Sequence, residues 1–281
     1  MLNRLDHAQN LLFKRILGLP KSCANEAVYL LLDLIPISRQ IDLEVLLVLG
    51  QYSCLTSDRI EKRTLVNALF SSTPLTGLWD KTLCKYNLPN LCNLLNTDVS
   101  YSDWKKIVIS SIYKQHHAVL ENAVASKSTL SLWIGRIPQD KNRYYPKQIS
   151  SPLLREAVYV RAQLSCQTYP TNARLFTIHQ SVSKTCDLCK SSAVENVIHF
   201  VAECPVLSRH RRMLQECIAD DKELTNVAGF FSEQCPLQFT LSILLLPDIS
   251  LSHQARNTLN LLILKFLHKI HLSRTALLQY H

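Results

Sequence analysis

Four side chains that can bind a metal ion lie close together in residues 184–212, KTCDLCKSSAVENVIHFVAECPVLSRHRR. They are Cys186, Cys189, His199 and Cys204, in the order Cys-x-x-Cys, then His, then Cys. A Cys-x-x-Cys turn supplies two thiolates from one tight knuckle, and a structural zinc ion takes four sulfur or nitrogen ligands in a tetrahedron. The spacing therefore predicts one structural Zn²⁺ ion held by these four residues.

Two other interpretations of the cysteines stay open. Free cysteine is among the most buried residue types, so each of these thiols could simply pack in a core. Disulfides are the second alternative, but disulfide scaffolds are small and cysteine-dense, whereas ten cysteines here are spread over 281 residues. Within the zinc interpretation, Cys217 competes with Cys204 for the fourth position. We favour zinc because of the two-plus-two spacing.

The composition is that of a folded and helical protein. The chain is 47% hydrophobic and 19% charged, and it holds only 5 glycines, which favours helices over turn-rich folds. The N-terminal segment MLNRLDHAQNLLFKR lacks a continuous apolar signal core, and the longest apolar runs are too short to span a membrane. We therefore expect an intracellular protein without membrane contact, in a reducing compartment that favours metal over disulfides.

The net charge of +9 is concentrated around the cysteine and histidine cluster. Residues 101–215 carry 16 Lys and Arg against 7 Asp and Glu, an excess of nine, whereas the rest of the chain carries 15 of each sign. Localised positive charge beside a metal knuckle is the electrostatic pattern expected for phosphate backbones. Solvated helix faces carry similar charge, so both interpretations stay open from charge alone.

Apolar residues recur at helical spacing along most of the chain. With the capping, proline and glycine signals, the pattern predicts helices at 5–16, 25–34, from Ser38, 58–70, 102–125, 152–165 and from Pro205. We expect Ser38 to cap its helix and the adjacent His116 and His117 to be exposed. The predicted fold is all-α, with irregular helical bundles and a small CCHC zinc knuckle between helices.

The composition along the chain predicts four segments: a helical domain at 1–130, a linker at 131–151, a basic helix with the zinc knuckle at 152–216, and an apolar helical tail at 217–281. The linker holds the basic and aromatic run Lys141–Tyr145. Its rings could stack on unpaired bases, although a solvated linker is the favoured interpretation.

Catalytic motifs are missing from the sequence. It has no Gly-rich phosphate loop and no aspartate pair placed for two metal ions. A metal site with four protein ligands also has no open position for a catalytic water. We therefore expect a binding module rather than an enzyme, with no catalytic residues and no small-molecule substrate.

Three blocks of sequence carry a resemblance to a known family. The first is the knuckle itself with Glu195, Phe200, Pro205 and Arg209–Arg212; the second is Arg155, Arg161–Leu164 and Arg174–Phe176; the third is Phe13–Pro20, Ala27–Val28 and Leu34–Ile37. In this order and spacing they resemble the C-terminal zinc-knuckle region of non-LTR (LINE-like) retrotransposon reverse transcriptases, over residues 1 to about 215. Asp33 departs from the glycine usual in that family. The family's polymerase core and its Asp-Asp motif would precede Met1, so we expect a C-terminal fragment of a larger polyprotein.

The resemblance implies that the chain binds RNA, or a DNA target during target-primed reverse transcription, in the nucleus and cytoplasm. The residues expected to contact phosphates are Arg155, Arg161, Arg174, Arg209, Arg211 and Arg212. The alternative function is a helical protein–protein interaction module with a structural zinc, in which the apolar tail docks a protein partner. Salt-dependent affinity for nucleic acid distinguishes the two functions.

Overall fold

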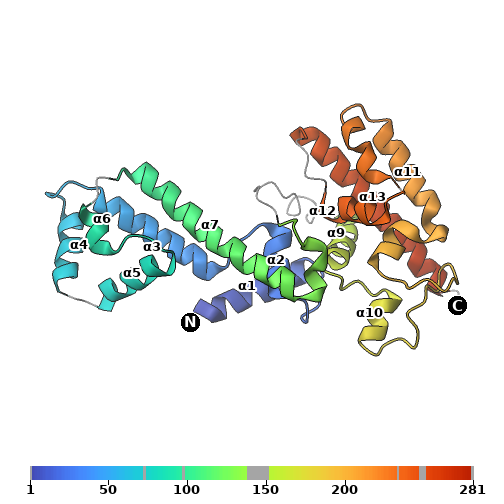
Figure 1. Ribbon diagram of the computed structural model, residues 1–281, viewed down its shortest axis with the longest axis horizontal. Helices are drawn as coiled ribbons and strands as arrows, with labels where there is room; N and C mark the ends of the chain where they lie inside the picture. Colours follow the sequence, from blue (N-terminus) through green and yellow to red (C-terminus); the bar gives the residue numbers. More distant parts are fainter. Residues whose placement is uncertain are drawn as a thin grey trace. The chain divides into compact units, whose positions relative to one another are not determined.

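The structure, a computed structural model, describes residues 2–71, 74–96, 99–137, 152–232, 234–246 and 251–279. These residues form helices and no strand (Figure 1), with one isolated antiparallel bridge between Thr185 and Val194. The predicted all-α class is therefore confirmed for the described part of the chain. Within that part, no helix combines the length and the apolar character needed to cross a membrane.

The chain divides into two units, and the division differs from the predicted segments. Unit 1 comprises residues Met1–Asn10 and Leu34–Ala123, and unit 2 comprises Leu11–Asp33 and Val124–His281. The predicted first domain is thus shared between both units, whereas segments 152–216 and 217–281 belong to one unit. Residues 138–151, which make up most of the predicted linker with its basic and aromatic run, lie outside the described residues.

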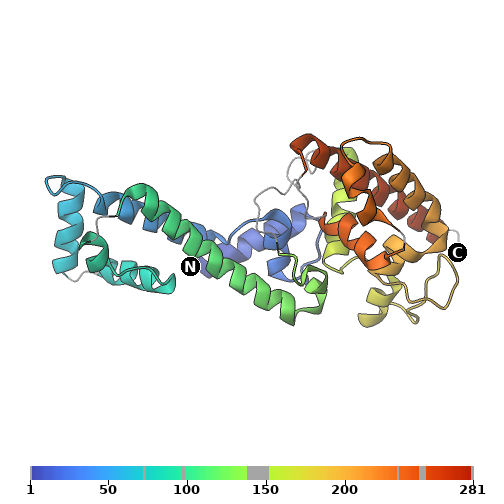
Figure 2. The same ribbon diagram turned by 45° about the horizontal axis from the view of Figure 1, so that its top comes forward.

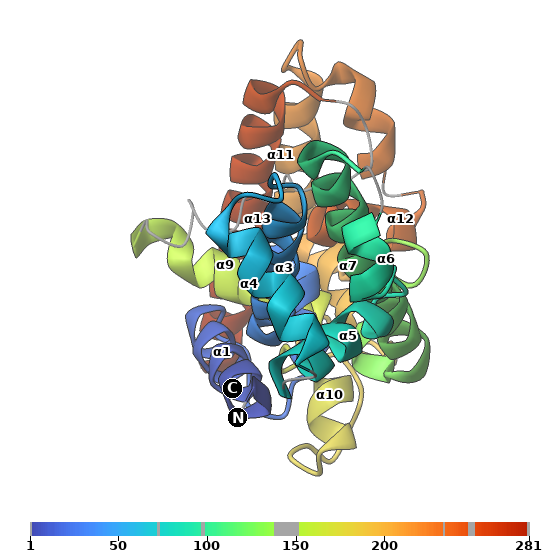
Figure 3. The same cartoon turned by 90° about the vertical axis from the view of Figure 1, so that its left-hand side faces the viewer.

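Unit 1 is a group of helices, labelled in Figure 3, and it has its own core. It contains the first part of α1 (Leu2–Ile16), then α3 (Ile37–Ser53), α4 (Ile60–Phe70), α5 (Pro74–Lys85), α6 (Leu91–Asn96) and most of α7 (Tyr101–Ser126). The buried residues of its core include Leu46, Leu49, Leu65, Leu83, Tyr86, Leu91, Trp104, Val108 and Ile112. In this core the indole nitrogen of Trp104 donates to the Leu46 carbonyl at 2.8 Å.

Helix α3 begins at Ile37, and the prediction that Ser38 caps it was wrong. The first amides of a helix have no acceptor within the helix. Here α1 supplies the acceptors, since Asp6 Oδ1 accepts from the Ser38 amide at 2.8 Å and Gln9 Oε1 accepts from the Ile37 amide at 3.0 Å. The Ser38 hydroxyl donates to Asp6 Oδ2 at 2.6 Å. A carboxylate from a distant helix therefore does the capping, which local sequence patterns do not reveal.

His116 is buried in unit 1, so the expectation that it is exposed was wrong; His117 is half-buried. The His116 Nε2 atom lies 3.2 Å from the Leu34 carbonyl oxygen. Burial, assisted by the positive charge of Arg39, lowers the pKa of His116 to about 4. The imidazole is therefore neutral at physiological pH and packs as a core residue.

Unit 2 holds the cysteine and histidine cluster. After α2 (Asn25–Leu32) its elements are η1 (Ser128–Trp133), α9 (Pro152–Ser165), α10 (Asn172–Thr177), η2 (His199–Glu203), η3 (Pro205–Leu207), α11 (Ser208–Ala219), η4 (Thr225–Phe231), α12 (Pro236–Leu245) and α13 (His253–Gln279). Helix α13 packs against both α9 and α11 (Figures 1 and 2). The long helix α13 thus forms the centre of this unit.

One core joins the knuckle to the apolar tail. Its buried residues include Val160, Leu164, Cys186, Phe200, Cys204, Leu214, Phe239, Leu259, Ile263, Leu267 and Ile270. These come from α9, the knuckle, α11, α12 and α13, so the tail supplies a large part of the apolar surface on which the knuckle is built. Burial of such apolar surface is the main favourable term in folding.

Two turns in unit 2 explain where its first helices end. Gly18 follows α1 with φ +63°, and a Cβ at this position would lie 2.7 Å from Cγ of Tyr159, so both conformation and space require glycine. Asp33 follows α2 in the left-handed conformation, at φ 51° and ψ 48°. This is the position where the resembled family has glycine, and aspartate is among the few other residues that adopt it.

Candidate metal centre

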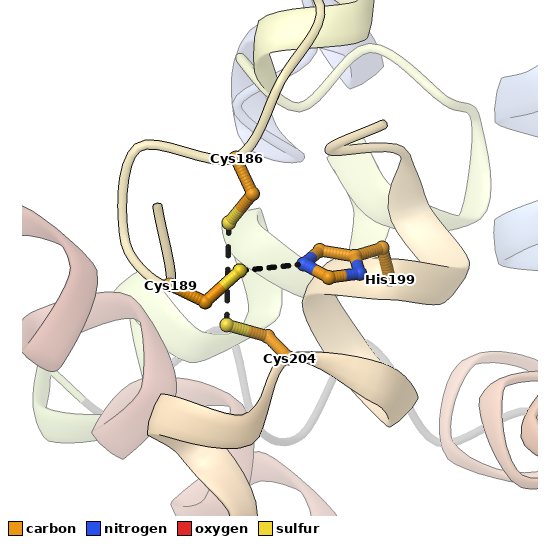
Figure 4. Close-up of side chains that lie close together, drawn as sticks. All are labelled: Cys186, Cys189, His199 and Cys204. Carbon is orange, nitrogen blue, oxygen red and sulfur yellow. Dashed lines mark hydrogen bonds between the residues drawn. The ribbon is translucent and has the colours of Figure 1, made fainter. Parts of the chain in front are cut away.

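The side chains of Cys186, Cys189, His199 and Cys204 converge on one point (Figure 4). Their sulfur and nitrogen atoms all lie within 4.8 Å of one another. The Cys186 and Cys204 sulfurs are 4.0 Å apart, and the Cys189 sulfur lies 3.5 Å from Nε2 of His199. This cluster can hold a metal ion, as the spacing predicted.

The first two ligands sit on a short hairpin. The Cys186 amide donates to the Ala193 carbonyl at 3.0 Å, and the Lys190 amide donates back to the Cys186 carbonyl at 3.1 Å. Lys190 closes the turn in the left-handed region, with φ 52°. The isolated bridge between Thr185 and Val194 then pairs the two arms of the hairpin. This turn presents both cysteine side chains on the same side, which explains the two-residue spacing.

The second two ligands are joined by a π-type turn. His199 begins η2, and the Cys204 amide donates to the His199 carbonyl at 2.7 Å, a bond that spans five residues. Such turns occur mostly as single insertions and often at functional sites. The Asn196 side chain starts this segment by accepting from the His199 amide at 2.8 Å. The five-residue separation therefore brings imidazole and thiol toward the same point.

The cluster includes Cys204 and not Cys217. Cys204 is fully buried among the other three ligands, whereas Cys217 is exposed on α11. Nδ1 of His199 lies 3.6 Å from a Glu203 carboxylate oxygen, so Nε2 faces the cysteines while Nδ1 faces an acid. A carboxylate at the second ring nitrogen is typical of metal-ligating histidines, because it orients the ring.

The three thiols differ in their tendency to ionise. Burial raises the pKa of Cys186 to about 12 and also raises the pKa of Cys204. Burial alone would raise the pKa of Cys189 too, but hydrogen bonds, led by the Ser191 hydroxyl at 3.0 Å, hold it at about 6. The two buried thiols would need a compensating cation to ionise, and a bound metal ion supplies that charge.

A buried network supports the knuckle from the side of α13. Glu195 is 1% exposed, and its carboxylate accepts from Arg274 Nε at 3.0 Å and from the Asn172 amide at 2.8 Å. Arg274 also lies over the rings of Tyr169 and Phe200. Burial opposes the charge of Arg274, but the Glu195 carboxylate keeps the arginine pKa above its ordinary value. This network fixes the hairpin to the long helix.

Several of these supporting residues were not predicted from the sequence. Asn196, three residues before His199, is a recognisable N-cap signal and could have been found. The pairing of Glu195 with Arg274 joins residues 79 positions apart, so no local pattern could have indicated it.

Two of the six predicted phosphate-binding arginines are buried, and for them the prediction was wrong. Arg161 is 3% exposed, and its guanidinium donates to the Leu244 carbonyl at 3.0 Å and to the Asn260 side chain. Arg211 is also 3% exposed and donates to the carbonyl of Cys204 at 3.0 Å. Both satisfy interior oxygens, and Arg211 ties α11 directly to Cys204.

The other four predicted arginines remain accessible. Arg155 on α9 and both Arg209 and Arg212 on α11 are exposed, and Arg174 in α10 is half-buried. The pKa of His210 on α11 is lowered from its ordinary value. The shift comes mainly from burial, and the positive charges of Lys269 and Arg209 add to it.

A comparison of the chain with protein-family models, with curated proteins and with solved structures found no match.

Proposed function

We propose that the cluster binds one structural zinc ion. Zinc–sulfur bonds of about 2.3 Å and zinc–nitrogen bonds of about 2.0 Å in a tetrahedron place two sulfurs about 3.8 Å apart and a sulfur and a nitrogen about 3.5 Å apart. The distances of 4.0 Å between the Cys186 and Cys204 sulfurs and 3.5 Å between Cys189 and His199 fit these values. Three thiols and one imidazole are also the soft donor set that zinc takes in closed structural sites.

The function that we propose for the chain is nucleic-acid binding, without catalytic activity of its own. One observation carries the proposal: α11 begins four residues after the last ligand, and its exposed Arg209 and Arg212 lie three apart on one face. Buried Arg211 holds this helix to the Cys204 carbonyl. The metal cluster therefore orients two guanidinium groups outward, and guanidinium groups are well suited to bidentate contacts with phosphate.

The sequence resemblance supports the same proposal. We propose that the chain corresponds to the C-terminal zinc-knuckle region of a non-LTR retrotransposon reverse transcriptase, with RNA or target DNA as its partner. The ligand order, the basic helix and the N-terminal block of Phe13–Pro20, Ala27–Val28 and Leu34–Ile37 carry this resemblance.

The alternative, an interaction module that docks a protein through residues 217–281, receives less support. The aromatic side chains of α12 and α13, Phe239 and Phe266, are buried in the core of unit 2. The large apolar residues that the described parts of these helices leave exposed, Leu237, Leu261, Leu272 and Leu277, carry no aromatic ring, and aromatic residues are the preferred apolar contacts at interfaces.

The experiment is a binding titration of the zinc-loaded chain with single-stranded RNA and with duplex DNA over a series of salt concentrations. We expect affinity to fall steeply as salt rises, because phosphate contacts release counterions. The double change Arg209→Ala with Arg212→Ala should weaken binding to all sequences alike. A plot of the logarithm of the binding constant against the logarithm of the salt concentration should also become less steep. Its slope should fall by about one unit for each arginine that neutralises a phosphate in the wild type.

The matched control is Arg59→Ala with Arg63→Ala, which removes two exposed arginines from unit 1. This control should bind like the wild type, and zinc content should stay unchanged in both variants. If the α11 variant keeps the affinity and the salt slope of the wild type, the interaction-module alternative becomes the better interpretation.

A further inference from the structure

Residues 172–185, the segment between α9 and the knuckle hairpin, form a protrusion that we name the finger. Figures 1 and 2 show α10 and the loop after it standing apart from α11, α12 and α13 of the same unit. After α10, His179 takes the left-handed conformation at φ 57°, and the Gln180 amide donates back to the Leu175 carbonyl at 2.8 Å. This bond reverses the chain and closes the end of the helix.

Hydrogen bonds close the finger at its base. The Asn172 side chain donates to the Thr185 carbonyl at 2.6 Å and to the Asp187 carboxylate at 2.7 Å, so both ends of the finger meet. The backbone amide of Asn172 is held by Glu195, the carboxylate that pairs with Arg274. The finger is therefore fixed to the metal knuckle, and a surface ordered in advance loses less entropy when it binds a ligand.

The finger exposes apolar side chains. Phe176 is 39% exposed, Ile178 two residues later is also exposed, and Val182 in the loop is 99% exposed. A phenyl ring left accessible on a fixed protrusion is more informative than a scattered exposed leucine, because aromatic rings are preferred contact residues. The Lys184 ammonium lies 4.8 Å from the centre of the Phe176 ring. Ring and cation thus form one mixed apolar and positive feature.

The finger and the adjacent hairpin also carry cations without acidic partners. Arg174, Lys184 and Lys190 have no ion pair with a carboxylate in the described part of the chain. Asp187 is the one acidic residue in the sequence from 172 to 194, and it accepts a hydrogen bond from Asn172. The local charge is therefore positive and complements an anionic ligand.

We propose that the finger binds single-stranded nucleic acid, with one unpaired base stacked on Phe176 and the neighbouring phosphates facing Lys184 and Arg174. This inference rests on the proposed function and specifies its substrate. A nucleotide presents a flat base next to a phosphate, which matches a ring next to an ammonium. Only unpaired bases offer an open face to a protein ring, because the bases of a duplex are already stacked on one another.

The experiment measures fluorescence anisotropy of the full zinc-loaded chain with a short labelled RNA of mixed sequence, single-stranded or annealed to its complement. The change Phe176→Ala should raise Kd for the single strand about 5- to 140-fold, the range given by one stacked base. Affinity for the duplex should change less than about twofold. Phe176→Trp should retain single-strand affinity, because indole offers a larger stacking face.

The matched control is Ile178→Ala, which removes a neighbouring exposed apolar side chain without removing a ring. It should bind both RNAs like the wild type, and all variants should keep the wild-type zinc content and circular dichroism spectrum.

Two outcomes would overturn the inference about the finger while leaving the proposed function in place. In the first, Phe176→Ala binds single strands as tightly as wild type while Arg209→Ala with Arg212→Ala binds weakly. In the second, Phe176→Ala and Ile178→Ala lose affinity equally, which indicates apolar docking rather than stacking. Failure of the wild type to bind both of these RNAs and duplex DNA contradicts the proposed function itself, and the inference with it.

Discussion

Gly50 shows how one missing side chain shapes unit 1. It lies within α3, where the Trp104 indole occupies the space that a side chain would take. A Cβ on Gly50 would lie 1.8 Å from Cδ1 and 2.1 Å from Nε1 of this ring. The indole is fully buried, and its nitrogen donates a hydrogen bond to the Leu46 carbonyl, so the ring has no free space into which to move. Glycine is needed here for close packing rather than for its backbone freedom.

We therefore expect Gly50→Ala to lower the free energy of unfolding by about 1–3 kcal/mol, the usual cost of overpacking a core. The measurement is urea unfolding followed by tryptophan fluorescence, since Trp104 itself reports on the site. Gly77→Ala in α5 is the control, because nothing lies within 4 Å of its Cβ position. That helical substitution should raise the unfolding free energy by about 0.4–1 kcal/mol. Equal effects of the two changes would refute the packing argument.

At the scale of elements, α13 is joined to the knuckle by a buried ion pair. Arg274 donates to Glu195 with Nε at 3.0 Å and with Nη2 at 3.2 Å, and to the Pro170 carbonyl at 2.9 Å. Removing the arginine would leave the Glu195 carboxylate in the interior without its cation. An uncompensated buried charge costs far more than a surface pair contributes.

The change Arg274→Met should therefore destabilise unit 2 by about 3–5 kcal/mol. Native-state hydrogen exchange of peptides from α11 and α13 measures this loss without interference from unit 1. Lys265→Met, an exposed position on the same helix, is the matched control and should stay within about 0.5 kcal/mol of wild type. A loss of similar size in both variants would show that the ion pair is not responsible.

The elements themselves could largely be predicted from the sequence. Apolar spacing and proline placed the helix 152–165 with its observed bounds, and the ligand spacing placed all four metal-competent side chains in one cluster. The orientation of Arg161 and Arg211 could not be predicted, since arginine usually lies at the surface and only tertiary contacts bury it. The capping of α3 by Asp6 depends on a contact over 32 residues, which local patterns do not contain.

For the whole molecule, the division into two units limits which helices a bound metal ion would stabilise. All four candidate ligands belong to unit 2, and the core around Trp104 in unit 1 contains none of them. Structural zinc contributes its binding free energy to folding. We therefore expect a chelator to remove hydrogen-exchange protection from residues 172–219, while α3 and α7 in unit 1 keep theirs.

The same reasoning predicts the metal content of single variants. Purified wild-type chain should contain one zinc ion, and Cys189→Ser should lose it, because a closed site needs all four ligands. Cys217→Ser changes an exposed thiol outside the cluster and should keep the full content. Elemental analysis of the three proteins is the measurement. Equal zinc content in the wild type and in Cys189→Ser would contradict the assignment of Cys189 as a zinc ligand.

The pairing of Glu195 with Arg274 also sets an order of events during synthesis. The two residues are 79 positions apart, and a ribosome adds about 5–20 residues each second, so roughly 4–16 s pass between them. Throughout that interval the nascent chain already contains Cys186, Cys189 and Glu195. Arg274, whose guanidinium group pairs with the Glu195 carboxylate, has not yet been added. The buried ion pair, and with it the final packing of Glu195, can therefore form only after most of α13 has been translated.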